Sequence, residues 1–66
     1  MNPSFEADIK DIADALGWVE VDARFITLSD ARRFAREHNH DLDIETWPED
    51  SKRPYRYKFK KREQKQ

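Results

Sequence analysis

Two short stretches near the end of the chain alternate strictly between apolar and charged residues. The first, DLDIETW (41–47), places Leu42 and Ile44 between acidic residues, and the second, YRYKFK (55–60), alternates aromatic with basic residues. A period of two predicts half-buried strands. The connection PEDSKRP (48–54) is short and has a proline at each end, so it predicts a turn, and we expect the two strands to pair antiparallel.

Antiparallel pairing of these strands would bring opposite charges together. The expected partners across the two strands are Asp41, Asp43 and Glu45 on one side and Arg56, Lys58 and Lys60 on the other. Each such pair contributes roughly 0.2–1 kcal/mol. The face expected to cover the core consists of Tyr55, Tyr57 and Phe59 with Leu42 and Ile44. Alternation also separates the aromatic from the cationic side chains of 55–60, which argues against nucleic-acid binding there, because base stacking and phosphate contact need one shared surface.

The first seventeen residues carry the signals of a helix. Asn2 suits the N-cap, Pro3 suits the first turn, and Gly17 suits the position just past the end. Apolar residues recur at spacings of four, three and four, so they form one stripe that we expect to face the core. This stripe consists of Phe5, Ile9, Ile12 and Leu16.

The middle of the chain predicts a strand and then a second helix. Residues 18–26 (WVEVDARFI) have a period of two. One face of this strand holds Val19, Val21, Ala23 and Phe25. Residues 27–40 return to helical spacing, with Thr27 or Ser29 as the cap and Asn39 as the stop. The inward positions of this helix are Leu28, Ala31, Phe34 and Ala35, with His38 as a further candidate.

The resulting order, α-β-α-β-β, predicts an α+β domain with two helices packed on a small three-stranded, mainly antiparallel sheet. The alternative is a degenerate winged-helix fold, which the helices and the basic hairpin fit in part. Asn39 leads almost directly into the strand at Leu42, which leaves no room for a separate recognition helix. We expect one compact domain over residues 1–60 and a flexible basic tail over 61–66.

Composition narrows the class of protein. Sixty-six residues allow one domain, and the absence of cysteine excludes a disulfide framework and a cysteine-based zinc site. A cysteine-free chain fits a reducing cytoplasm, which is the expected compartment. The longest apolar run is too short to span a membrane, so we expect no membrane partner.

Charge is strongly segregated along the chain, although the formal net charge is only −1. Residues 1–22 hold six acids and one lysine, whereas 23–40 hold four arginines and two acids. Residues 41–50 hold five acids and no base, and 51–66 hold eight bases and one acid. Segregation of this kind concerns partners rather than fold.

Three charged sets are candidate contact sites. On the second helix, an arginine cluster suited to carboxylates or phosphates consists of Arg32, Arg33 and Arg36. The outer side of the first helix presents an acidic set, Asp8, Asp11 and Asp14. The basic end of the chain is the alternative site, for nucleic acid, and consists of Lys52, Arg53, Lys61, Arg62 and Lys65.

The signals of catalysis and metal binding are weak. The chain has no cysteine nucleophile and a single glycine, and its serines occupy expected caps or turns. We therefore predict no enzyme, no catalytic residues, no cofactor and no small-molecule substrate. A metal site would draw on HNHD (38–41) and Asp43, but this spacing matches no strong metal-binding pattern and favours a helix terminus, so no metal is predicted. Trp18 and Trp47 are expected in the core or at its edge; an exposed tryptophan would instead be the main anchor of an interface.

The segment TLSDARRFARE between two predicted strands resembles small strand-helix-strand proteins, including bacteriophage-encoded inhibitors of host enzymes. The resemblance covers about a sixth of the chain and transfers no functional residue. The small size of the chain alone suggests a protein encoded by a phage or mobile element. We interpret the chain as a non-enzymatic regulator or inhibitor that docks on a protein partner through charge-segregated surfaces, with nucleic-acid binding by the basic end as the alternative.

Overall fold

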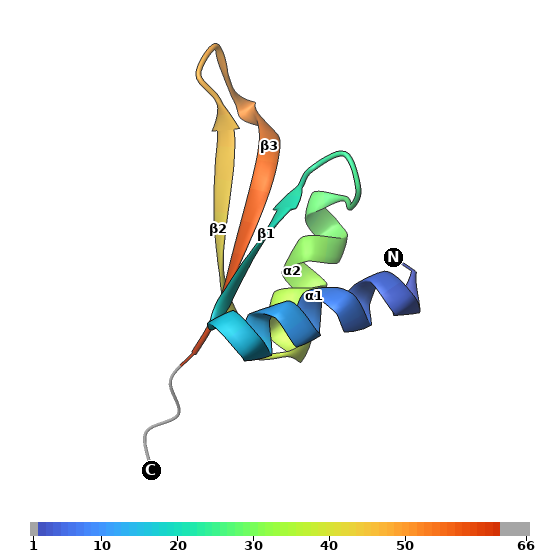
Figure 1. Cartoon of the computed structure of the whole chain (residues 1–66). Coiled ribbons are helices and arrows are strands. Elements are labelled where there is room, and N and C mark those ends of the chain that lie inside the picture. The colour runs from blue at the N-terminus through green and yellow to red at the C-terminus, as the bar shows by residue number, and fades with distance from the viewer. Residues whose placement is uncertain (1, 63–66) are drawn as a thin grey trace.

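The computed structural model describes residues 2–62 and has the predicted α+β architecture (Figure 1). The elements are α1 (Pro3–Leu16), β1 (Trp18–Asp22), α2 (Leu28–Glu37), β2 (His40–Trp47) and β3 (Asp50–Lys61). Both helices lie on one side of the three-stranded sheet, and no helix or strand of residues 2–62 covers its other face, which we call the uncovered face. The β2–β3 hairpin continues past the ends of both helices and of β1.

The sheet has the order β1-β3-β2, and β3 pairs antiparallel with both neighbours. The predicted register between β2 and β3 is confirmed: the opposed pairs are Asp41 and Lys60, Asp43 and Lys58, and Glu45 and Arg56. On its other side, β3 places Lys58 opposite Glu20 and Arg56 opposite Asp22. The basic central strand therefore lies between two acidic strands, which explains why its cations alternate so regularly.

Helix α1 begins and ends at the predicted residues. The Asn2 side chain accepts a hydrogen bond from the Ser4 N–H at 2.8 Å, and Gly17 ends the helix at a φ of 85°. The predicted apolar stripe is partly wrong, because Ile9 is buried but Ile12 is 45% exposed and Leu16 is 62% exposed. α1 packs mainly over the edge strand β1, and within residues 2–62 no strand lies beyond β1 to cover the outer part of this stripe. Ala13, which is small enough to allow close approach, faces the sheet instead.

Helix α2 also matches its sequence signals. Thr27 is the N-cap, and its Oγ1 accepts a hydrogen bond from the Asp30 N–H at 3.1 Å. After the C-cap at His38, Asn39 adopts a φ of 56°, a left-handed conformation that ends the helix and that Asn tolerates well. The inward residues Ala31, Phe34 and Ala35 are buried as predicted.

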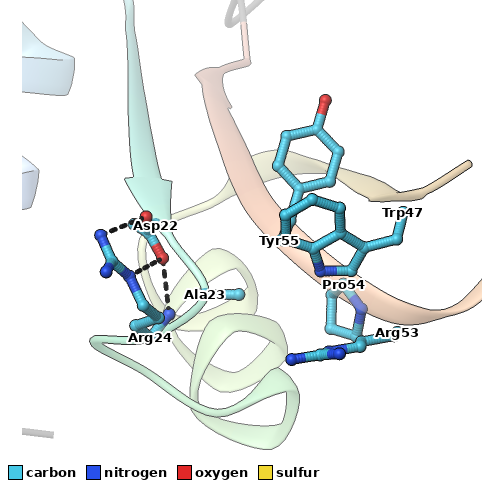
Figure 2. Close-up of a pocket in the computed structure, with 7 residues that line it drawn as sticks. All are labelled: Asp22, Ala23, Arg24, Trp47, Arg53, Pro54 and Tyr55. Atoms are coloured by element: carbon cyan, nitrogen blue, oxygen red, sulfur yellow. Dashed lines mark hydrogen bonds and ion pairs between the residues drawn. The ribbon is translucent and has the colours of Figure 1, made fainter.

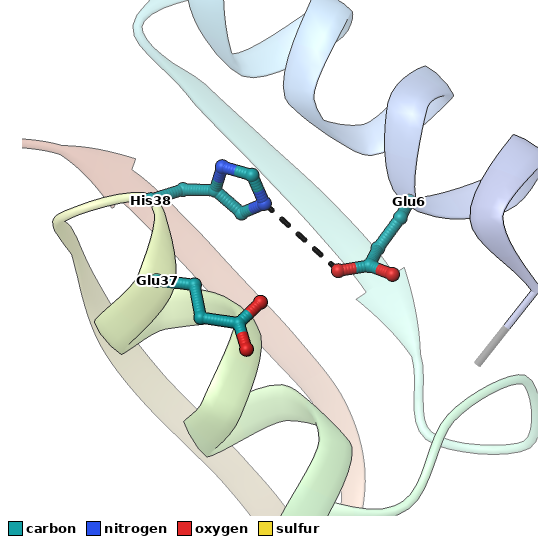
Figure 3. A group of neighbouring side chains, drawn as sticks. All are labelled: Glu6, Glu37 and His38. Carbon is teal, nitrogen blue, oxygen red and sulfur yellow. Dashed lines mark ion pairs between the residues drawn. The ribbon is translucent and has the colours of Figure 1, made fainter.

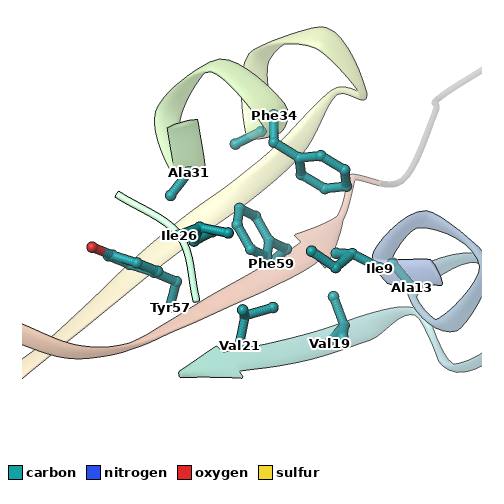
Figure 4. Close-up of a cluster of buried hydrophobic side chains, with 10 residues drawn as sticks. Ile9, Ala13, Val19, Val21, Ile26, Ala31, Phe34, Tyr57 and Phe59 are labelled. Carbon is teal, nitrogen blue, oxygen red and sulfur yellow. The ribbon is translucent and has the colours of Figure 1, made fainter. Parts of the chain in front are cut away.

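One cluster of buried side chains connects both helices with the sheet (Figure 4). Its largest fully buried members are Phe34, Tyr57 and Phe59, and the rings of Phe34 and Phe59 meet edge to face at 5.0 Å. Leu42 packs against this cluster, as predicted. Ile44 and Tyr55 were expected over the core as well, but neither belongs to the cluster. Ile44 lies opposite the buried Tyr57 on the edge strand β2 and is 38% exposed, and Tyr55 lies closer to the end of the hairpin.

Strand β1 is shorter than its pattern predicts. It ends at Asp22, whose carboxylate accepts a hydrogen bond from the Arg24 N–H at 2.8 Å and so starts a turn. Phe25 was expected on the buried face but is 66% exposed, whereas Ile26 is buried. The local turn chemistry of Asp22 therefore overrides the hydrophobic alternation.

The predicted turn over 48–54 is confirmed only at Pro48 and Glu49, because β3 already begins at Asp50. The β2–β3 register shifts between Glu45 and Thr46 and again between Thr46 and Trp47. Thr46 lies opposite Pro54, a residue that cannot donate a ladder hydrogen bond and that sheets accommodate at bulges. Pro54 thus marks an irregular hairpin end rather than a loop.

Candidate functional site

The irregular end of the hairpin forms one wall of a shallow hollow of about 440 Å³ (Figure 2). The turn after β1 forms the other wall. We call this site the hairpin-end hollow, and it is lined by Asp22, Ala23, Arg24, Trp47, Arg53, Pro54 and Tyr55.

The register shift brings aromatic and cationic side chains onto one surface of this hollow. The Trp47 and Tyr55 rings lie 5.3 Å apart, and the Arg53 guanidinium lies 5.8 Å from the centre of the Trp47 ring. Figure 2 shows these three side chains converging from two strands. The separation of aromatics from cations that alternation imposes within 55–60 therefore does not extend to the hairpin end.

Hydrogen bonds hold both walls of the hollow in place. The Glu45 carboxylate accepts a hydrogen bond from the Tyr55 hydroxyl at 2.6 Å and another from Arg56 at 2.6 Å. These donors, Arg56 first, lower the pKa of Glu45. On the opposite wall, the backbone N–H and side chain of Arg24 bind the Asp22 carboxylate and lower its pKa. Hydrogen bonds thus hold Tyr55 on one wall of the hollow and the Asp22–Arg24 pair on the other.

Both tryptophans are exposed, contrary to their expected place in or beside the core. Trp47 is 40% exposed and Trp18 is 43% exposed. Trp18 lies on the uncovered face of the sheet, where the Lys58 Nζ is 5.1 Å from the centre of its ring. Trp47 lies in the hairpin-end hollow, next to Thr46, which is paired with Pro54 at the irregular end.

The predicted arginine cluster lies on the exposed side of α2. Arg33 forms an ion pair with Asp30 at 2.9 Å. Within residues 2–62, the side chains of Arg32 and Arg36 form no hydrogen bond or ion pair. They line a depression of about 300 Å³ that Arg62 also lines. Two guanidinium groups one helical turn apart are therefore available to carboxylate or phosphate groups of a partner.

The acidic set on α1 is divided by its contacts. Asp14 forms ion pairs with Lys10 at 2.8 Å and with Lys61 at 3.5 Å, and the hydrogen bond from Lys10 is the main cause of its lowered pKa. Asp8 and Asp11 are exposed, and neither forms an ion pair with another residue of 2–62. Two of the three predicted carboxylates are therefore available at the surface.

The residues of the basic end do not come together in the described chain. Lys52 and Arg53 lie near the hairpin end of β3, whereas Lys61 and Arg62 lie near its other end. Arg62 also forms an ion pair with Asp41 at 2.6 Å. Lys65 lies outside the described residues.

Of the HNHD residues, only His38 belongs to a group within residues 2–62 that could hold a metal ion. The other members of this group are Glu6 and Glu37, and the three ligand atoms lie within 4.8 Å of one another (Figure 3). Glu6 and His38 are 3.9 Å apart and connect the start of α1 with the end of α2. His40 is only 4% exposed, and its Nδ1 has no hydrogen-bond partner within the described residues. Burial lowers the pKa of His40, so it is an uncharged core residue near neutral pH.

Comparison of the chain with protein-family models, with curated proteins and with solved structures gave no match. Within residues 2–62, neither helix is long and apolar enough to cross a membrane. The argument about function therefore depends on the surfaces described above.

Proposed function

We propose that this chain is a non-enzymatic interaction protein of the regulator or inhibitor kind, and that it docks on a protein partner. The observation that supports this most is the exposed Trp47 in a hollow that it shares with Arg53 and Tyr55. Trp, Tyr and Arg are the residue types that most often dominate the binding energy of protein interfaces.

Trp47 contributes little to the fold. It lies outside the buried cluster, in the part of the hairpin that runs past the helices. A large apolar side chain that is only partly covered by its own chain gains free energy when a partner removes it from water. The hairpin-end hollow is therefore the proposed anchor of the interface.

The charged helix faces are the proposed orienting surfaces. The basic face is Arg32, Arg33 and Arg36, and the acidic face is Asp8, Asp11 and Asp14. Complementary charges on a partner accelerate encounter and select orientation more than they add affinity. Their contribution should therefore decrease as salt rises.

A comparison of the two exposed tryptophans tests this proposal. The protein is immobilised and used to capture partners from the cells that encode it, in parallel with Trp47→Ala and Trp18→Ala variants. Each tryptophan is similarly exposed and has a cationic neighbour, so Trp18→Ala is a matched control. We expect one protein to be retained by the parent and by Trp18→Ala and lost with Trp47→Ala. Equal retention by all three would contradict the proposal.

One observation favours the second candidate, binding of single-stranded nucleic acid. Arg53 and two aromatic rings share one surface, as base stacking with phosphate contact requires. The acidic residues Glu45, Glu49 and Asp50 in the same hairpin oppose it. Fluorescence anisotropy with mixed-sequence DNA and RNA across a salt series separates the two candidates. Salt-sensitive binding that Trp47→Ala and Arg53→Ala both remove would favour nucleic acid.

A further inference from the structure

The outer edge of β1 lies beside a groove that the fold leaves open. β1 pairs with β3 on one side and with no other strand of the described chain on the other. The groove between α1 and β1 has a volume of about 330 Å³. Its apolar lining consists of Phe5, Ile9, Ile12, Val19, Val21 and Phe25. The exposure of Ile12 and Phe25, which the core leaves unexplained, places both of them at this groove.

The backbone of β1 presents unpaired hydrogen-bonding groups along the same edge. The Gly17 C=O accepts a hydrogen bond from the Lys61 N–H at 2.9 Å, and the Ala23 N–H donates to the Tyr55 C=O at 3.0 Å. Antiparallel ladders alternate, so the odd-numbered residues between them face β3 and Trp18, Glu20 and Asp22 face outward. Within residues 2–62, one of these outward groups forms a backbone hydrogen bond: the Asp22 C=O accepts it from the Phe25 N–H at 3.1 Å. An edge of this kind is a template for an additional strand.

The strand that β1 already pairs with indicates what such a segment would look like. On the helix side of the sheet, β3 places Phe59 opposite Val19 and Tyr57 opposite Val21. On the uncovered side, Glu20 lies opposite Lys58, and its carboxylate forms an ion pair with Arg56 at 2.8 Å. The outer edge of β1 offers the same two faces, apolar toward α1 and acidic on the other side. A strand added there needs apolar residues alternating with basic ones.

The acidic rim of the groove selects the same chemistry. Asp8 from α1 and both Glu20 and Asp22 from β1 line it, and no basic residue does. Glu20 forms an ion pair with Arg56 and Asp22 with Arg24, so Asp8 is the carboxylate of this rim that has no ion pair within residues 2–62. A second copy of this chain is a poor occupant. Antiparallel pairing of β1 with its own copy over the full strand would place Glu20 opposite Glu20, and directly opposed like charges are destabilising.

We propose that the outer edge of β1 binds an extended, alternating apolar and basic segment of a protein partner as a fourth strand of the sheet. Main-chain hydrogen bonds to Trp18, Glu20 and Asp22 supply one part of the recognition. The groove under α1 supplies the other part by accepting the apolar side chains. This inference deepens the proposed function and takes from it the existence of a protein partner. It uses a surface other than the hairpin-end hollow, so the two can fail separately.

A peptide with the sequence of residues 55–61, YRYKFKK, is a defined probe of the required pattern. It is titrated into the ¹⁵N-labelled full chain and followed by amide chemical shifts and amide hydrogen exchange. We expect shift changes and slower exchange at Trp18 and Glu20, together with shift changes at Ile12 and unchanged shifts at Trp47. A charge-reversed peptide, YEYEFEE, is expected not to bind.

Two substitutions of Glu20 separate the contribution of the backbone hydrogen bond from that of the carboxylate charge. Glu20→Gln removes the carboxylate but keeps the outward N–H, whereas Glu20→Pro removes both and leaves the ladder to β3 intact. We expect Glu20→Pro to bind the peptide about tenfold more weakly than Glu20→Gln does. Ile12→Glu, at an exposed position, is expected to weaken binding through the groove while the protein stays folded.

Three results would overturn this proposal. The peptide YRYKFKK could fail to bind, the two Glu20 variants could bind it equally well, or its shift changes could centre on Trp47 instead of β1. A dimer in sedimentation analysis, with the Trp18 and Glu20 amides protected in the absence of peptide, would also overturn it, because the occupant would then be a second copy. The Trp47→Ala capture experiment tests only the hairpin-end hollow. Its result therefore does not decide whether the outer edge of β1 binds the peptide.

Discussion

The two halves of the β2–β3 hairpin have nearly the same kinds of residues but different environments. In the half beneath the helices, strict alternation buries Phe59 and Tyr57 against α1 and α2 and pairs the charges on the other face. In the half that runs past the helices, the register shifts at Thr46 and Trp47 is left exposed. Since only the covered half has a helical layer to pack against, only that half is constrained by folding. The projecting half can therefore be shaped for a partner.

The largest expected contrast between these halves is in stability. Phe59→Ala removes a fully buried ring and should cost about 3–5 kcal/mol, comparable to the whole stability of a domain this small. Phe59→Leu, with an expected cost of about 1 kcal/mol, keeps the test measurable. Trp47→Ala should change the free energy of unfolding by about 0.5 kcal/mol or less. Urea denaturation followed by circular dichroism measures all three, and a similar cost for Trp47→Ala and Phe59→Ala would refute the division.

A smaller effect is expected at the cap of α2, the helix that covers the regular half. Thr27→Ala leaves the Asp30 N–H without its side-chain acceptor and should cost about 1 kcal/mol. Ser29→Ala, at an exposed position of the first turn, is the control and should be nearly neutral. Equal effects of the two substitutions would mean that the Thr27 cap contributes nothing specific.

Acidification should weaken the covered half through His40. Burial lowers the pKa of His40 in the folded state, so the unfolded chain binds the proton first as pH falls below about 6.5. The free energy of unfolding should therefore decrease from about pH 7 to about pH 5, before most carboxylates titrate. His40→Leu should flatten this slope, whatever its effect at neutral pH. If the free energy of unfolding of His40→Leu depends on pH as steeply as that of the parent, groups other than His40 cause the pH dependence.

The smallest effect concerns the wall of the hairpin-end hollow. The hydrogen bond that the Tyr55 hydroxyl donates to Glu45 raises the pKa of Tyr55. Glu45→Gln should lower that pKa, and the NMR signals of the Tyr55 ring across an alkaline titration would report it. Because burial raises the pKa of Tyr57, its signals provide an internal control that should not move. If Glu45→Gln leaves the pKa of Tyr55 unchanged, the Glu45 carboxylate does not hold the Tyr55 side chain in this wall.

Sequence patterns predict the covered part of this molecule well and the projecting part poorly. Caps at Asn2 and Thr27 and the charge register of β2 with β3 follow from local rules, and the structure confirms them. Ile12 and Phe25 were assigned to the core because periodicity identifies apolar positions without showing whether another element covers them. Pro54 was interpreted as part of a turn because a proline in a strand is unusual, and only the three-dimensional register shows the bulge.

Shortening the hairpin tests the central claim most directly. Replacement of residues 46–55 by Asn-Gly would join Glu45 and Arg56, which already lie opposite each other, through a favoured two-residue turn. The account predicts that this variant keeps its fold, loses about 1 kcal/mol of stability with the removed contacts, and no longer captures the protein partner. A shortened protein that does not fold, or that binds the partner as the parent does, would contradict it.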